Sequence, residues 1–206
     1  MQTNTAPYDA TLSQPLNLSF EGGISTDSVL SDPPQGKTVL LLSSKKRIED
    51  AFIRFAIPLE EQGIQMICQG LSGGLGRMQA EFTSAEGTSI WLITPWIFES
   101  IEVPFESIDH LIIDTLPFDH PAHTVLSKRS EHYQNPFGEY TLPRLQHRLY
   151  RILRTFCRYK TKDADALLLD KRLETKGYGK DVWKYLKQLT EKPETKDSPE
   201  DQLVLF

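Results

Sequence analysis

Cysteine is scarce in this chain: only Cys68 and Cys157 occur among its 206 residues. Two thiols cannot by themselves complete the four-ligand set of a structural zinc or iron–sulfur site, and they do not provide a disulfide framework. We therefore expect no iron–sulfur cluster and no metal site in this chain, and a reducing compartment.

Long apolar runs are also missing. No run approaches the roughly 18 residues that a membrane-spanning helix needs. The polar start Met1-Gln-Thr-Asn-Thr-Ala-Pro7 lacks the charged and apolar regions of a signal peptide. These absences predict a cytoplasmic protein without a membrane partner.

Positive charge is not in excess, because 23 Lys and Arg residues face 28 Asp and Glu residues and the net charge is −5. Such a chain has no overall electrostatic attraction for nucleic acid, so any site for phosphate groups must be local. The apolar fraction of 39% is nevertheless enough for a packed core.

Strand-like and helical patterns alternate from residue 37 to about residue 190. The runs at 38–42, 64–68, 89–94, 110–114 and 166–169 are apolar without clean alternation, as in parallel strands that are covered on both faces. We expect a doubly wound α/β domain at 37–190, with a mostly parallel sheet, helices on both faces and ligands at the carboxyl ends of the strands. Residues 1–36, in which only 16–20 has strand character, are expected to form a leader or linker, and 191–206 a disordered tail.

The triplet Gly36-Lys37-Thr38 looks like the end of a phosphate-binding loop. However, Ser31 stands where that loop has its first glycine, and Asp32-Pro-Pro34 replaces a glycine-rich cradle. The lysine of such a loop opens a helix, whereas an apolar strand run follows Lys37. We expect a turn that enters a strand, and no nucleotide site.

A helix that begins near residue 142 carries arginine on one face. Its apolar residues fall within a sector of about 100°. The opposite side holds Arg144, His147, Arg148, Arg151, Arg154 and Arg158, with no acid from residue 144 to residue 159. A purely solvating face usually mixes both signs. The pattern leaves two interpretations open, a solvated surface and a site for the phosphates of a nucleotide or of nucleic acid.

The segment Asp170-Lys-Arg-Leu-Glu-Thr-Lys-Gly-Tyr-Gly-Lys180, preceded by Leu167-Leu-Leu169, resembles the closing strand and loop of DinG-type helicases, bacterial relatives of the XPD-type superfamily 2 DNA helicases. Supporting matches follow in the same order as in the second RecA-like domain of that family: Gln69-Gly70, Leu116-Pro-Phe118, Asn135-Pro-Phe137 with Tyr140, and Leu142-Pro143. The resemblance covers residues from about 36 to 190 and implies a RecA-like helicase domain.

Two motifs depart from the family pattern. In the segment after Thr94, Glu99 matches the family, whereas Ser100, Glu102 and Phe105 replace Gly, Asp and Gly. The arginine motif Gln-x-x-Gly-Arg-x-x-Arg, aligned without gaps to Asp170, retains only its last arginine, at Arg158. A shifted register, which needs a four-residue gap, places both arginines at Arg151 and Arg154. We favour the gapless register.

The resemblance implies the second lobe of an ATP-dependent DNA helicase. A first lobe, in the same chain or in another, would bring the phosphate-binding loop and the magnesium ligands, so this chain alone should not hydrolyse ATP. The implied catalytic residues are Arg158, Arg154 and Arg151, the nucleotide contacts are Glu99, Glu102 and Arg158, and the contacts to single-stranded DNA are Ser43, Ser44, Gln69, Gly70, Trp96 and Arg148. For Trp96, packing in the core is an equal alternative. The alternative function is a non-catalytic accessory module of DNA repair or replication.

The chain closes on Gln202-Leu-Val-Leu-Phe206 after a polar spacer. This pentapeptide resembles the motif by which bacterial polymerases and repair proteins bind the sliding clamp. Gln202 would fix the orientation, while Leu203, Leu205 and Phe206 would fill an apolar pocket. The alternative is a short segment that folds back onto the domain.

Overall fold

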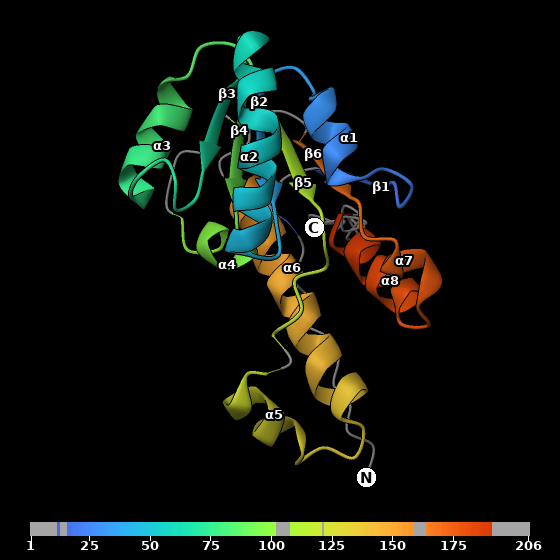
Figure 1. Cartoon of the computed structure of the whole chain (residues 1–206). Helices are drawn as coiled ribbons and strands as arrows, with labels where there is room; N and C mark the ends of the chain where they lie inside the picture. The colour runs from blue at the N-terminus through green and yellow to red at the C-terminus, as the bar shows by residue number, and fades with distance from the viewer. Residues whose placement is uncertain (1–11, 13–15, 102–107, 121, 159–163, 191–206) are drawn as a thin grey trace, which may run out of the picture.

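One parallel sheet organises the chain (Figure 1). The computed structural model describes residues 12, 16–101, 108–120, 122–158 and 164–190. Its strands are β1 (Leu16–Phe20), β2 (Lys37–Leu41), β3 (Gln65–Cys68), β4 (Ser89–Ile93), β5 (His110–Ile113) and β6 (Ala164–Leu168). Every pairing in the order β1-β6-β5-β2-β4-β3 is parallel. The predicted α/β fold with a parallel sheet is confirmed.

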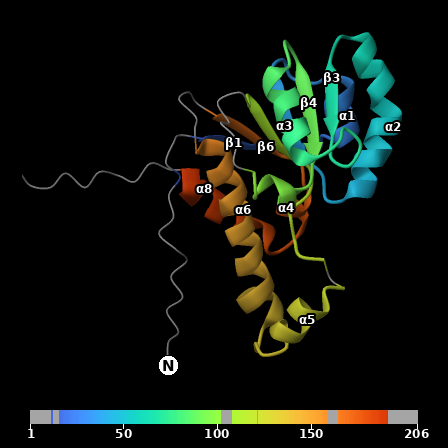
Figure 2. The ribbon, with the colours of Figure 1, turned by 90° about the vertical axis from the view of Figure 1, so that its left-hand side faces the viewer.

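Helices cover both faces of the sheet, as Figure 2 shows. One face carries α1 (Thr26–Ser31) and α2 (Lys45–Glu61). The other face carries α3 (Leu75–Ser84), α4 (Pro95–Phe98), α6 (Leu142–Cys157), α7 (Arg172–Thr175) and α8 (Gly179–Thr190). Strand β2 shows the reason for the unbroken apolar runs: Val39 and Leu41 belong to the core under α6, and Leu40 belongs to the core under α2.

The segment between β5 and β6 leaves the sheet and returns. It contains α5 (Thr124–Ser130), the π-helical turn η2 (Phe137–Thr141) and the long helix α6. In Figures 1 and 2, α6 runs from the sheet to α5, well beyond the other elements. Its apolar side, with Leu145, Leu149 and Ile152, is buried as the periodicity predicts.

The domain includes residues before 37, where the sequence suggested a leader or linker. Strand β1 pairs with β6 in register from Leu16 to Phe20. Helix α1 buries Val29 and Leu30, and the Thr26 hydroxyl donates a hydrogen bond to Asp114 after β5. This contribution was missed because the loops around these short elements are rich in polar residues, glycine and proline.

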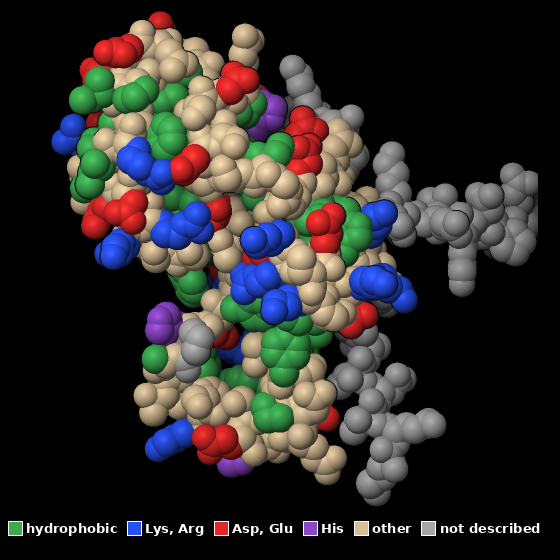
Figure 3. All heavy atoms as spheres, turned by 45° about the vertical axis from the view of Figure 1, so that its right-hand side comes forward, with side chains coloured by type: hydrophobic (Ala, Val, Ile, Leu, Met, Phe, Trp, Pro, Cys, Tyr) green, Lys and Arg blue, Asp and Glu red, His purple; other side chains and the backbone are tan. Residues whose placement is uncertain are grey.

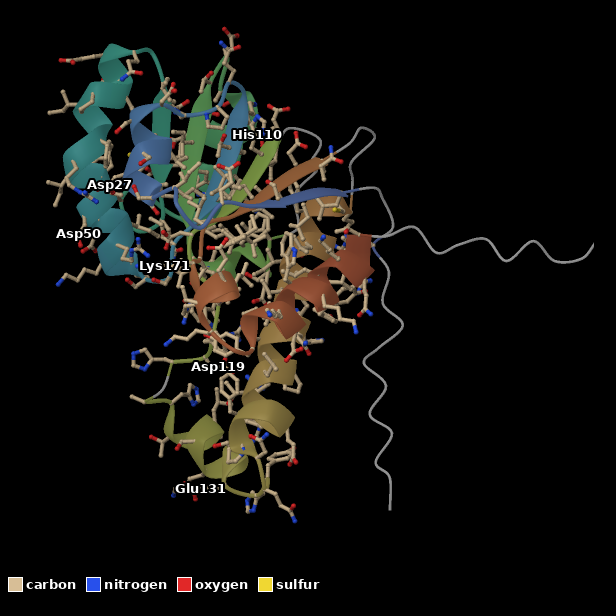
Figure 4. The ribbon with its side chains drawn as sticks, turned by 90° about the vertical axis from the view of Figure 1, so that its right-hand side faces the viewer. Asp27, Asp50, His110, Asp119, Glu131 and Lys171 are labelled. Atoms are coloured by element: carbon tan, nitrogen blue, oxygen red, sulfur yellow. The ribbon has the colours of Figure 1, made fainter. Side chains whose placement is uncertain are left out.

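The carboxyl ends of the parallel strands share one edge of the sheet. Figure 4 labels Lys171, which follows β6 on that side, and His110, which begins β5 at the opposite, amino edge. Lys37 is the first residue of β2, so the interpretation of Gly36-Lys37-Thr38 as a turn into a strand is confirmed. Within the described ranges, no helix is long and apolar enough to cross a bilayer.

Candidate nucleotide and nucleic-acid interface

The polar side of α6 borders an open hollow of about 740 Å³. Most of the predicted arginine face takes part in it. The lining residues are Glu99, Pro143, Arg144, Gln146, His147, Arg148, Tyr150, Arg151, Arg154 and Tyr185. Because α6 buries its apolar side against the sheet, these polar side chains are held on a rigid support. The helix therefore places four arginines and one histidine along the hollow.

Glu99 anchors two of these arginines. It follows α4, whose Phe98 is fully buried, so the backbone before it is fixed. Its carboxylate is 6% exposed and lies 3.0 Å from Arg148 Nε and 3.2 Å from Arg151 Nη1. The alignment of the Arg148 Nε contact falls short of a hydrogen bond, so its attraction is mainly coulombic. Burial raises the pKa of Glu99, although Arg148 and Arg151 oppose the shift.

Asp119 pairs with two arginines that line the hollow, Arg144 and Arg148. Arg144 Nε donates to its Oδ2 at 2.5 Å, and Arg148 Nη1 donates to its Oδ1 at 2.9 Å. Burial alone would raise the pKa of Asp119, but the hydrogen bonds from Arg144 and Arg148 outweigh it and lower the pKa. Figure 4 places Asp119 between the sheet and the outer end of the segment marked by Glu131.

The arginine face is thus not free of acids, which corrects the picture from the helix sequence alone. Arg144, Arg148 and Arg151 are paired with carboxylates from other elements. Within the described part of the chain, Arg154 has no ion-pair partner. Partial burial lowers the pKa of His147, and the charges of Arg151, Arg144 and Arg148 lower it further. An added anion would therefore first meet Arg154 and the outer side of Arg151.

The two registers of the arginine motif differ in where they place the arginines. Arg151 and Arg154 both line the hollow. Arg158 is the exposed C-cap residue of α6 and does not line it. The structure therefore brings Arg151 and Arg154, the arginines of the shifted register, to one hollow with Glu99. Arg158, the arginine of the gapless register, lies outside the hollow.

At the carboxyl edge, two of the residues predicted to contact DNA, Ser44 and Gln69, form hydrogen bonds inside the protein. Ser44 is the N-cap of α2, and its Oγ accepts from Arg47 N. Gln69 Oε1 is buried and accepts from the amide and the hydroxyl of Thr94. These acceptors are engaged inside the protein. Ser43 is half-buried and Gly70 is exposed at a positive φ of 87°.

Trp96 lies at the surface and not in the core, which removes one of its two predicted environments. It is 40% exposed on α4, and the Arg148 guanidinium carbon lies 5.1 Å from its ring centroid. The indole therefore stands next to the hollow. An exposed indole in this position can stack with a nucleobase.

Asp170 and Arg172 form a hydrogen-bonded pair that connects two segments of the chain. The sequence alone identified these residues only as part of a family-like segment. Asp170 is buried and accepts from Leu116 N at 2.6 Å, from Arg172 N at 3.0 Å and from the Arg172 guanidinium. These bonds tie the segment after β6 to the segment after β5. A side chain at Gly179 would collide with the carbonyl of Leu173, which explains a glycine at the start of α8.

The described residues contain no group of three side chains suited to a metal ion. Arg151 and Arg154 line the hollow, and guanidinium groups are common partners of phosphate. Glu102 and the clamp-like residues Gln202, Leu203, Leu205 and Phe206 lie outside the described residues. Cys68 and Cys157 are both buried, and burial raises the pKa of Cys68 to about 12.

Comparison with known proteins shows the family and the fold. The chain is 25% identical to the 3'-5' exonuclease DinG of Bacillus subtilis (strain 168) over 157 aligned residues. The aligned region covers 74% of this chain and 17% of the DinG protein. A solved XPD helicase superposes with a TM-score of 0.61 at 13% identity, over 84% of this chain and 34% of the other. An apo XPD structure gives 0.55 at 10% identity, over 85% and 39%. The helicase C-terminal domain model matches residues 28–189, and the chain therefore belongs to that family, in its DinG and XPD branch.

Proposed function

We propose that this chain serves as the second RecA-like lobe of an ATP-dependent DNA helicase, with Arg151 and Arg154 directed at a nucleotide held by a first lobe. The observation that carries this proposal is the hollow along α6, where both arginines stand beside Glu99. Arg158, outside the hollow, is not part of this proposal.

The chemistry asks for fixed positive charge at the phosphate that is transferred. ATP supplies the reactive phosphoanhydride, and negative charge develops on its outer phosphate oxygens. The two carboxylate oxygens of Glu99 contact different arginines, one Arg148 and the other Arg151. The contact orients Arg151 before any ligand binds. Arg154 contributes a guanidinium that no described carboxylate neutralises.

The isolated chain should show no DNA-stimulated ATP hydrolysis, and a separately purified first lobe of a DinG-type helicase should restore turnover. In that mixture Arg154→Ala should lower kcat by about 10³-fold, because an arginine at the transferring phosphate contributes about that much or more. Arg129→Ala, an exposed arginine of α5 outside the hollow, is the control. Turnover by the chain alone, or restored turnover that Arg154→Ala leaves unchanged, would contradict the proposal.

We also propose that the same surface contacts the phosphates of single-stranded DNA. Charge reversal in Arg151→Glu/Arg154→Glu should weaken the binding of a fluorescent oligothymidylate by at least about tenfold at low salt, and the slope of affinity against salt should decrease. Fluorescence anisotropy measures both quantities. Lys128→Glu/Arg129→Glu on α5 is the matched control, because these exposed cations do not line the hollow. Equal weakening in the two double variants would count against the α6 site.

A non-catalytic accessory module is the second candidate. It is favoured by the carboxylates of Glu99 and Asp119, which neutralise part of the arginine face. DNA binding through α6 without any restored ATP hydrolysis would support this second function over the first.

The proposed partnership with a bacterial sliding clamp depends on Gln202-Leu-Val-Leu-Phe206 in the sequence. Calorimetry with purified clamp should give a dissociation constant on the order of micromolar for the full chain. A chain that ends at Asp201 should not bind, and equal heats from both would remove the clamp as a partner.

A further inference from the structure

Three aromatic rings from distant parts of the chain meet beside the segment that carries α7. Phe118 follows β5, Phe137 opens η2, and Tyr178 precedes α8. The Phe137 and Tyr178 ring centroids are 5.1 Å apart, and Phe118 lies 5.6 Å from Tyr178 and 6.2 Å from Phe137. The Arg172 guanidinium carbon lies 5.2 Å from the Phe118 centroid. The four side chains form one cluster, in which the rings meet in tilted and edge-to-face contacts.

This group is not closed off as a core would be. Phe118 and Tyr178 pack against the main core, whereas Phe137 leaves 40% of its surface exposed. Phe137 also lies in a π-helical turn, a conformation that is rare and is found frequently at functional sites. Single exposed apolar residues are common on proteins, but an exposed ring on a stack that a guanidinium also borders offers a π-face to a ligand.

The surroundings carry net positive charge. Tyr178 lies in the segment 170–181, which has four cations and three acids, and one of the acids, Asp170, is paired with Arg172. Lys171, Lys176 and Lys180 are all exposed. Figure 3 shows Lys and Arg side chains gathered next to a patch of hydrophobic side chains. Aromatic faces combined with cations suit unpaired bases and their phosphates, whereas paired bases in a duplex expose no face for stacking.

The platform is joined to the α6 hollow. Arg144, which lines the hollow, lies 5.4 Å above the ring centroid of Tyr140 in η2. Asp119, which holds Arg144, directly follows Phe118. Arg144 therefore connects the hollow to η2 and to the residue after Phe118.

We propose that Phe118, Phe137 and Tyr178 form a stacking platform for unpaired nucleobases, with Lys171, Lys176 and Lys180 as contacts to the neighbouring phosphates. This inference rests on the proposed binding of single-stranded DNA and adds a second subsite to it. The platform reads no sequence, because every base offers a π-face.

Two probes of equal length separate base stacking from phosphate contact: an oligothymidylate and an abasic strand. Phe137→Ala should weaken binding of the oligothymidylate by about tenfold and leave binding of the abasic strand unchanged. Phe137→Trp should keep or increase the affinity for the oligothymidylate. Because Phe137 also contacts Phe118 and Tyr178, circular dichroism checks that both variants are folded at the temperature of the binding measurement.

The outcomes distinguish this proposal from the one it rests on. The platform is overturned if Phe137→Ala leaves the affinities for both probes unchanged, or if it weakens the binding of both probes equally. If both probes bind the unmodified chain equally and both respond to Arg151→Glu/Arg154→Glu, the α6 site stands and the platform falls. If neither probe binds the unmodified chain, both proposals fail.

Discussion

Arg148→Ala should lower the free energy of unfolding by about 3 kcal/mol, because it leaves two largely buried carboxylates without their shared cation. Glu99 is 6% exposed and Asp119 is 16% exposed, and Arg148 contacts both. Arg151 and Arg144 remain on the two acids, so the loss should lie at the lower end of the range for breaking a buried ion pair. Urea denaturation followed by circular dichroism measures the change.

The pH dependence of that loss identifies its cause. The pKa of Glu99 is raised by burial, so the native state holds this proton more tightly than the unfolded chain does. The stability contributed by this group therefore falls as pH rises above the ordinary glutamate range. The effect of Arg148→Ala should shrink from about pH 7 to about pH 5, and Glu99→Gln added to Arg148→Ala should recover part of the loss. The pairing contributes little if Arg148→Ala costs no more stability than Arg129→Ala. The same conclusion follows if neither the lower pH nor the added Glu99→Gln alters the loss.

Asp170→Asn should lower the free energy of unfolding by about 3 kcal/mol at neutral pH. The side chain is 6% exposed and accepts from two backbone amides and from the Arg172 guanidinium. An amide keeps the shape but loses the charge and one acceptor oxygen. Asp165→Asn, on an exposed residue of β6 whose partner is Asn17, is the control and should cost less than about 0.5 kcal/mol.

Acid should reduce the difference between the unmodified chain and Asp170→Asn. Burial favours the neutral form of Asp170, but the hydrogen bonds from Arg172 and from the Leu116 and Arg172 amides prevail and lower its pKa. Its stabilising contribution is complete above the unfolded pKa of about 3.9 and is lost as pH falls through the lower folded value. Denaturation curves at several pH values test this, and a difference that stays constant into strong acid would contradict it.

The two acids thus have opposite effects on stability as pH changes. Glu99 is shifted up and favours the folded state less as pH rises, whereas Asp170 is shifted down and favours it more. The difference arises from hydrogen bonding. Asp170 receives two backbone amides, while Glu99 has only side-chain partners, one of them without hydrogen-bond alignment.

Local pattern was sufficient for much of the fold. Apolar runs of strand length are visible in the sequence because each strand is covered on both faces, and α6 is visible because its buried residues recur with the helical period. The segment 16–31 was not recognised as part of the domain, because a five-residue edge strand and a six-residue helix carry too few residues for a pattern.

The sequence by itself determined the alternation of strands and helices, the family-like closing segment and the cationic side of α6, since each depends on neighbouring residues. The tertiary structure alone decided which arginines act together. Glu99 and Asp119 come from loops that the parallel sheet brings to α6, and they hold Arg148 and Arg151 around one hollow while Arg158 lies outside it. No periodicity along a helix can reveal partners that arrive from 25 or more residues away, because charge pairing acts through space and not along the chain.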